Sequence, residues 1–215
     1  MNRTGLVRTA AVAGLAAALG LTAAAPALAA DPITAVADLN GDGQLETVTA
    51  QLTGEGDQLI SATVNGTYTS IHLPADSRFG IEAPRVTDLN GDGRAELVVA
   101  QSIGANTTFF SILHYDGRTL SQVVGADDQP FSVAEGGGVA AHLGYRCTPF
   151  EGGRAFATVA AEADDISRPV DQLTYSGTRT VYTLRDGALS VQETVPFSGR
   201  PSTDPLLTED SASCA

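Results

Sequence analysis

The sequence predicts an all-β fold built from repeated units of about four strands each. A segment over residues 37–51 recurs over residues 87–101, and the spacing of the two copies is 88 − 38 = 50 residues. Between the copies, short β-branched and apolar runs are separated by turn residues such as Asn-Gly and Asp-Gly. No long window after residue 31 shows the hydrophobic period of a helix. These observations together favour a β-repeat architecture.

The first 30 residues predict a secretory signal peptide. Two arginines precede an apolar run over residues 10–25, and Ala27-Leu28-Ala29 supplies the small residues of a cleavage site. The run is about 16 residues long, which is too short to span a membrane comfortably. We therefore expect a secreted protein, cut after Ala29 or Ala30, that does not insert into a membrane once the signal is removed.

The mature chain is strongly acidic. Removal of two arginines with the signal leaves 10 basic and 25 acidic residues, a formal charge of 10 − 25 = −15. Such a surface repels nucleic acid and attracts cations. Nucleic acid is therefore excluded as a partner, and an extracellular protein or a glycan is expected instead.

The remaining chain predicts one repeat domain over residues 31–197. Its units are expected at about 31–80, 81–130 and 131–197. In the third unit, one more period leads to Gly138, and we expect the acidic loop of the other units to be replaced by a longer loop that carries Cys147.

Nine strands are predicted from β-branched runs that turn residues enclose. The dipeptides Asn65-Gly66, Asp116-Gly117 and Asp186-Gly187 predict tight hairpins between some of them. The predicted strands are 47–52, 59–64, 68–73, 97–102, 107–114, 119–124, 156–161, 179–184 and 189–195.

The repeated segments each contain Asp-Leu-Asn-Gly-Asp-Gly, a pattern of alternating oxygen donors that suits Ca²⁺. Counting the first Asp as position one, side-chain oxygens come from positions one, three, five and nine, and a backbone carbonyl comes from position seven. Glycines at positions four and six allow the chain to turn around an ion. Two calcium sites are predicted. Their ligands are Asp38, Asn40, Asp42, Gln44 and Glu46 in the first loop, and Asp88, Asn90, Asp92, Arg94 and Glu96 in the second.

The acidic residue at position nine distinguishes these loops from an EF-hand, which requires a Glu at position twelve, where Thr49 and Val99 stand. With this spacing the loops resemble the FG-GAP/VCBS repeat, the calcium-binding hairpin of integrin-like β-propellers and of many secreted bacterial proteins. The resemblance covers residues 33–124 and implies a mainly structural calcium between two strands of a blade. Because such propellers close with about seven blades and this chain has material for three, we expect an incomplete propeller, a compact β-stack or an assembly of chains. We favour a single compact monomer.

The two cysteines, Cys147 and Cys214, predict a disulfide, since an even count in an exported chain favours pairing. It would hold the C-terminal tail, residues 198–215, against the domain.

No catalytic motif is present, and the protein is not expected to be an enzyme. The three histidines, His72, His114 and His142, lie in or beside predicted strands without the sequence context of a metalloprotease or a serine hydrolase. The leading hypothesis is a calcium-stabilised extracellular module with a structural or binding role. The alternative is a secreted hydrolase whose active site the sequence does not reveal.

Overall fold

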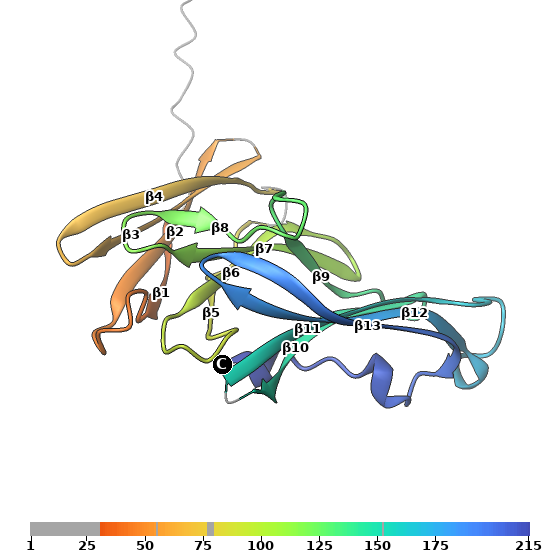
Figure 1. Ribbon diagram of the computed structural model, residues 1–215. Helices are drawn as coiled ribbons and strands as arrows, with labels where there is room; N and C mark the ends of the chain where they lie inside the picture. Colours follow the sequence, from red (N-terminus) through yellow and green to blue (C-terminus); the bar gives the residue numbers. More distant parts are fainter. Residues whose placement is uncertain (1–30, 55, 77–79, 152) are drawn as a thin grey trace, which may run out of the picture.

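The computed structural model describes residues 31–54, 56–76, 80–151 and 153–215, so the predicted signal peptide lies outside the described residues. The all-β prediction is confirmed. The described residues form two antiparallel sheets, with no α-helix and no closed barrel. Figure 1 shows the first sheet at one end of the molecule and the long strands of the second sheet extending away from it.

The first sheet is a four-stranded meander in the order β1-β2-β3-β4. Its strands are β1 (Ile33–Ala37), β2 (Glu46–Gly54), β3 (Asp57–Val64) and β4 (Thr67–Pro74). Each strand pairs with the next along the chain, as expected for short hairpin connections. The turn between β3 and β4 has positive φ at Asn65 (49°) and Gly66 (76°), the conformation that the Asn-Gly pair predicts.

The second sheet has nine strands, of which eight lie in the order β13-β12-β11-β10-β9-β7-β6-β5, while β8 pairs with β7. These strands are β5 (Arg85–Thr87), β6 (Glu96–Ile103), β7 (Thr107–Tyr115), β8 (Leu120–Gln122), β9 (Ser132–Gly136), β10 (Ala141–Phe150), β11 (Gly153–Ala163), β12 (Thr174–Arg185) and β13 (Ala188–Pro201). In the described residues, three short 3₁₀ helices accompany them: η2 (Val170–Gln172), η3 (Pro205–Leu207) and η4 (Ser211–Cys214).

Strand β9 joins the expected second and third units into one sheet. It pairs with the first half of β7, where Thr107 lies opposite Gly136, and it reaches β10 through the pair Leu143 and Gly136. A continuous sheet therefore runs through both units, in place of two separate four-stranded blades.

The third unit contains a tight turn where a longer loop was expected, and this part of the prediction was wrong. Phe150 at the end of β10 pairs with Gly153 at the start of β11, and Cys147 lies within β10 itself. The strands pair continuously up to the turn, which leaves no room for a long loop between them.

Every predicted strand is present, whereas β1, β5, β9 and β10 were missed. Strand β5 is only three residues long. Strand β10 contains Gly144 and Pro149, residues that weaken a strand pattern in the sequence.

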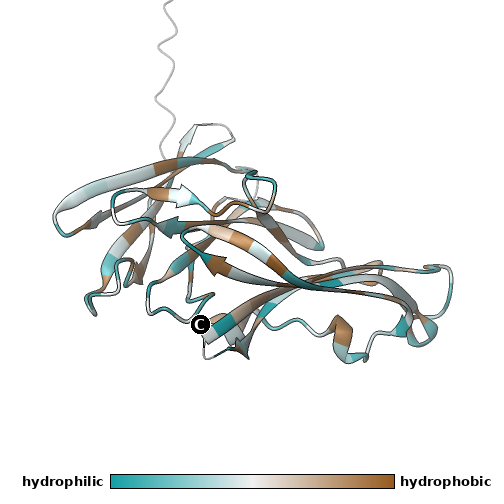
Figure 2. Cartoon of the chain, in the orientation of Figure 1, coloured by the Kyte–Doolittle hydropathy of each residue, from teal (hydrophilic) through white to brown (hydrophobic). Residues whose placement is uncertain are grey.

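Strand β6 is buried on both faces, and this places it between two hydrophobic cores. Leu97 and Val99 pack into the first core, together with Val48, Ile60 and other residues of the first sheet. Val98 and Ala100 face the second core, which includes Phe156 of the third unit. A third, smaller cluster lies further along β11 to β13 and contains Tyr175 and Phe197. Figure 2 shows brown, hydrophobic segments along the strands and teal, hydrophilic loops at the far end of the long hairpins.

The two repeated segments differ at the positions that decide their burial. Thr47 and Thr49 of β2 stand where β6 has Leu97 and Val99. The side chain of Thr47 is exposed and that of Thr49 is half-buried, while both β6 residues are fully buried. The outer face of the first sheet is thus polar because no strand of the described residues packs on it, as in the terminal unit of a repeat protein.

The predicted disulfide is present in the structure and joins Cys147 of β10 to Cys214 of η4. It holds the C-terminal tail against the second sheet. The tail begins later than expected, because β13 extends to Pro201.

We predict that Phe156→Ala lowers the free energy of unfolding by about 3–5 kcal/mol. Phe156 is fully buried and its ring lies 5.6 Å from that of Tyr145 and 6.2 Å from that of Phe131, so truncation leaves a cavity in the second core. Urea denaturation measures the change. Tyr68→Ala, at a ring that is 63% exposed, serves as the control and should change the stability by less than about 0.5 kcal/mol. Equal effects of the two substitutions would contradict the assignment of this core.

Candidate metal centre

The two acidic loops occupy equivalent places in the fold. Loop 1, residues 38–45, connects β1 to β2, and loop 2, residues 88–95, connects β5 to β6. The strands pair at the mouth of each loop, with Ala37 opposite Glu46 and Thr87 opposite Glu96. This strand pairing therefore places the residue at position nine of each loop beside the residue that precedes position one.

Asp38 organises loop 1 by accepting hydrogen bonds from its backbone. The N–H groups of Gly41 and Asp42 donate to its Oδ1 at 2.7 and 3.2 Å, and the N–H of Gly43 donates to its Oδ2 at 2.8 Å. This turn requires positive φ at Gly41 (77°) and Gly43 (82°), a conformation that costs little for glycine alone. The carboxylate thus lies inside the curve of the loop.

The other predicted side-chain donors of loop 1 extend this network. Asn40 Oδ1 accepts from the N–H of Asp42 at 3.0 Å, and Asp42 Oδ1 accepts from that of Gln44 at 2.8 Å. Glu46 is buried and its Oε2 accepts from the N–H of Leu39 at 2.9 Å. Oxygen atoms from positions one, three, five and nine therefore all accept hydrogen bonds from backbone N–H groups of the same turn.

Loop 2 repeats this arrangement bond for bond. Asp88 accepts from Gly91, Asp92 and Gly93, Asn90 Oδ1 accepts from Asp92, Asp92 Oδ1 accepts from Arg94, and Glu96 Oε2 accepts from Leu89. Two segments with the same sequence pattern thus have the same local structure.

The loops offer oxygen donors of the kind that Ca²⁺ prefers, but their carboxylates are not gathered into a metal cluster. In the part of the chain that the structure describes, no three His, Cys, Asp or Glu side chains are grouped so that they could hold a metal ion. The carboxylates instead accept N–H groups of the loop backbone. Gln44 and Arg94, expected to contribute carbonyl oxygens, are exposed.

Glu96 is the most deeply buried acidic side chain of the two loops, at 4% exposure. Burial raises its pKa from 4.5 to about 8, and the negative charges of Asp92 and Asp88 add to this effect, while the hydrogen bond from Leu89 opposes it. Burying a carboxylate beside two others disfavours its charged form. A cation at this place would offset that cost.

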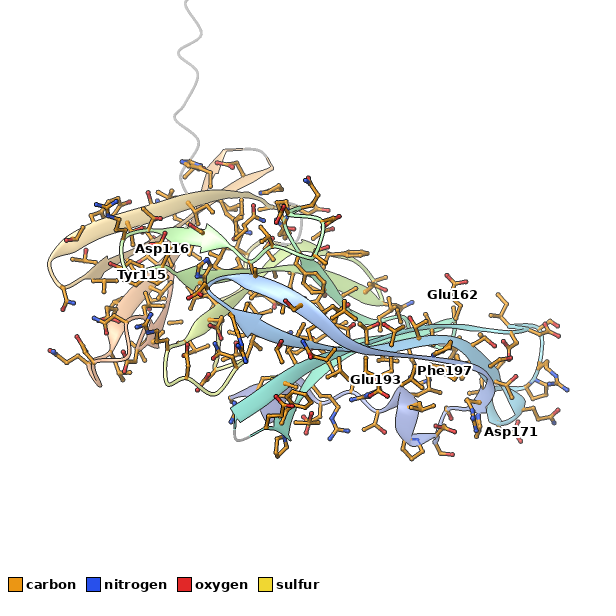
Figure 3. The ribbon with its side chains drawn as sticks, in the orientation of Figure 1. Tyr115, Asp116, Glu162, Asp171, Glu193 and Phe197 are labelled. Carbon is orange, nitrogen blue, oxygen red and sulfur yellow. A yellow bond between two sulfur atoms is a disulfide. The ribbon has the colours of Figure 1, made fainter. Side chains whose placement is uncertain are left out.

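A cavity of about 160 Å³ lies beside loop 2, between it and two hairpins that are remote in sequence. Besides the loop residues Asn90, Asp92 and Glu96, it is lined by His114 and by two further carboxylates, Asp116 and Asp186. Figure 3 labels Asp116 and its neighbour Tyr115 at the end of β7. The imidazole of His114 packs on Gly187, and burial lowers its pKa. No local sequence pattern connects these residues with loop 2. Their shared signal is that each lies in a hairpin with an Asp-Gly turn.

We predict that, in excess chelator, stability decreases as the pH rises from about 5 to 8. The folded state holds a proton on Glu96 that the unfolded state has released, so the stabilisation by that proton is complete below pH 4.5 and is lost as the pH rises through about 8. Glu96→Gln keeps an oxygen acceptor for Leu89 but cannot titrate.

Comparison of the two proteins isolates this effect, because the lowered pKa of His114 acts in the opposite direction in both. The free energy of unfolding, measured by urea denaturation at several pH values, should fall more steeply with pH in the unsubstituted protein than in the variant. Parallel pH profiles would contradict the prediction.

A comparison with protein-family models agrees with this geometry. A model described as an FG-GAP-like repeat matches residues 38–99, which span loop 1, the strands β2 to β5, loop 2 and the first half of β6. Searches of curated proteins and of solved structures returned no significant match. The segment from Asp38 to Val99 is thus an FG-GAP-like repeat.

Proposed function

We propose that this protein is a secreted, calcium-binding β-repeat module with a structural or binding role outside the cell. The observation that carries the proposal is the pair of loops that share the pattern Asp-x-Asn-x-Asp-Gly-x-x-Glu within an FG-GAP-like repeat. A single loop of this kind is explained equally well as a polar turn. Two loops with complete donor sets and the same internal hydrogen bonds favour the same kind of ligand in each loop.

The donor chemistry supports calcium. Each loop combines three carboxylates with one carboxamide and available backbone carbonyls, all of them oxygen ligands, and has no sulfur or imidazole donor. Ca²⁺ takes six to eight oxygens in flexible geometry, whereas Mg²⁺ demands a near-ideal octahedron. Asp38, Asn40, Asp42 and Glu46 with the Gln44 carbonyl would hold one ion, and Asp88, Asn90, Asp92 and Glu96 with the Arg94 carbonyl a second. The ions would supply positive charge that neutralises these carboxylates.

We propose a stabilising rather than a catalytic role for the ions. Both loops lie at the start of the strands that build the cores, since Glu46 opens β2 and Glu96 opens β6. An ion bound in each loop would hold that loop in place at the start of β2 or of β6. The described residues contain no feature that favours the hydrolase alternative.

Location outside the cell is supported by the signal-like N-terminal sequence and by the Cys147–Cys214 disulfide, which oxidising compartments favour. None of the helices in the described residues has the length and apolarity needed to cross a membrane. We propose that the mature protein acts as a monomer. Its partner, an extracellular protein or a glycan, would meet a surface with a strong negative charge.

We predict that calcium raises the melting temperature of the mature protein. At a concentration of about 100 times Kd, each occupied site adds about 2.7 kcal/mol of stability, which corresponds to about 5–10 °C for a chain of this size. The Asp38→Ala, Asp88→Ala double variant removes the first ligand of both loops and should lose the response. Circular dichroism melts with calcium chloride and with excess chelator measure the difference.

The control for this experiment is Asp127→Ala with Asp165→Ala. It removes the same charge from two exposed turns outside the loops, so it should keep the full calcium response. An unsubstituted protein whose melting temperature is the same in calcium and in chelator would overturn the proposal.

We predict further that expression of the full chain in a bacterial host with an active export pathway yields extracytoplasmic protein that begins at Ala30 or Asp31. Mass spectrometry of the purified protein determines this N-terminus. Retention of all the first 30 residues in exported protein would contradict the signal peptide.

A further inference from the structure

The two loops have the same internal structure but are held differently from outside. Across the described residues, loop 1 receives one hydrogen bond from beyond its own unit, which the N–H of Ala95 donates to the carbonyl of Asp38 at 2.7 Å. The side chain of Arg94 lies against Gly41, where a Cβ would stand 3.1 Å from its Cγ. Arg94 makes packing contact there and donates no hydrogen bond to this loop.

Loop 2 is held at its first ligand by an arginine of the third unit and by the C-terminal tail. Arg154 Nη1 donates to the carbonyl of Asp88 at 2.8 Å and to the carbonyl of Cys214 at 3.1 Å. The N–H of Asp88 in turn donates to that same Cys214 carbonyl at 2.9 Å. Both backbone groups of Asp88 are therefore fixed by residues more than 60 positions later in the chain.

The third position of loop 2 is held in the same way. The N–H of Arg154 donates to the carbonyl of Asn90 at 3.1 Å, and Asn90 Nδ2 donates to the carbonyl of Leu184 at 3.4 Å. At the next residue, Gly91, a Cβ would stand 3.3 Å from the backbone nitrogen of Arg154, which shows how closely the two backbones approach. Arg154 thus contacts three residues of the loop, Asp88, Asn90 and Gly91.

The disulfide determines where the Cys214 carbonyl lies. Cys214 is fully buried, bonded to Cys147 of β10, and the N–H of Cys147 donates to Ser213 Oγ at 2.9 Å. A chain end without such an anchor is among the most mobile parts of a protein. The bond therefore turns a tail carbonyl into a fixed acceptor for Asp88 and Arg154.

We infer that Arg154 and the disulfide-bonded Cys214 are positioning residues for calcium at loop 2, and that loop 1 has no equivalent of them. This inference rests on the proposed function. Groups that orient metal ligands without touching the metal typically change its affinity 10- to 100-fold when they are removed. By fixing the backbone of Asp88 and Asn90 before binding, these residues reduce the ordering that binding must pay for.

The test separates the two sites by using each loop alone. Full-length mature protein with Asp38→Ala retains only loop 2, and protein with Asp88→Ala retains only loop 1. Arg154→Met is added to each, because methionine keeps much of the packing of the arginine stem but has no hydrogen-bond donor. Calcium affinity is measured by isothermal titration with calcium chloride.

We expect Arg154→Met to weaken calcium binding about tenfold in the protein that retains loop 2, and to change it less than about twofold in the protein that retains loop 1. Arg179→Met is the matched control. Arg179 donates to another tail carbonyl, that of Thr208, at 3.1 Å. Its substitution removes the same charge as Arg154→Met, but at a residue that does not contact loop 2. It should change neither affinity by more than about twofold.

A second variant and a second measurement guard against a loss of folding. Cys147→Ser with Cys214→Ser removes the disulfide but keeps Arg154, and should weaken loop 2 selectively in the same way. In calcium-free protein that still melts cooperatively, either change should speed hydrogen exchange at the Asp88 amide. The Asp42 amide of loop 1 should exchange as before.

The outcomes distinguish the two proposals. Calcium binding by neither loop would overturn the proposed function, and the positioning role with it. Calcium binding that Arg154→Met weakens equally at both loops, or at neither, would overturn the positioning role alone. A lower melting temperature with unchanged affinity at loop 2 would also overturn it, since Arg154 would then be a structural brace.

Discussion

Burial of β6 on both faces is the constraint on which the rest of the structure depends. Leu97 and Val99 pack against the first sheet, while Val98 and Ala100 pack against the third unit, so one strand belongs to both cores. A strand enclosed in this way has to be apolar at nearly every position. Its position also determines where the loops lie, because loop 2 ends at its first residue and loop 1 contacts the residue before it through the bond from Ala95 to Asp38.

In its described residues the third expected unit has no acidic loop, but it contacts loop 2 much as the second expected unit contacts loop 1. The sequence Gly153-Arg154-Ala155 repeats Gly93-Arg94-Ala95, and the arginine of each set lies against the fourth-position glycine of the preceding loop. Arg94 does this by packing, whereas Arg154 also donates hydrogen bonds. The two arginines thus occupy similar positions against the preceding loop. Because a tight turn joins β10 to β11, the third expected unit contacts loop 2 but has no comparable loop at this place.

The sequence alone predicted the all-β class, most of the strands and the glycine turns of the two acidic loops. The strands between residues 46 and 74 and the central strands of the second sheet were predicted from β-branched runs and from dipeptides such as Asn65-Gly66, whose positive φ the structure shows. Strands such as β5 and β9 were missed because short segments carry little pattern and are strands only through their partners. The cavity residues His114 and Asp186 were not linked to loop 2, since 72 residues separate them from each other (186 − 114) and no local signal connects them.

The sequence by itself determined those structural features that depend on residues close together in the chain. Every internal hydrogen bond of an acidic loop joins residues at most seven positions apart, so two segments that share seven of nine residues form the same turn. The threonines at residues 47 and 49 likewise encode an outer face. Only the tertiary structure decided the contacts between distant segments. These are the pairing of β9 with both β7 and β10, and the hydrogen bonds that connect Arg154 and Cys214 to Asp88. Such contacts depend on how whole sheets pack, which no local pattern of side chains specifies.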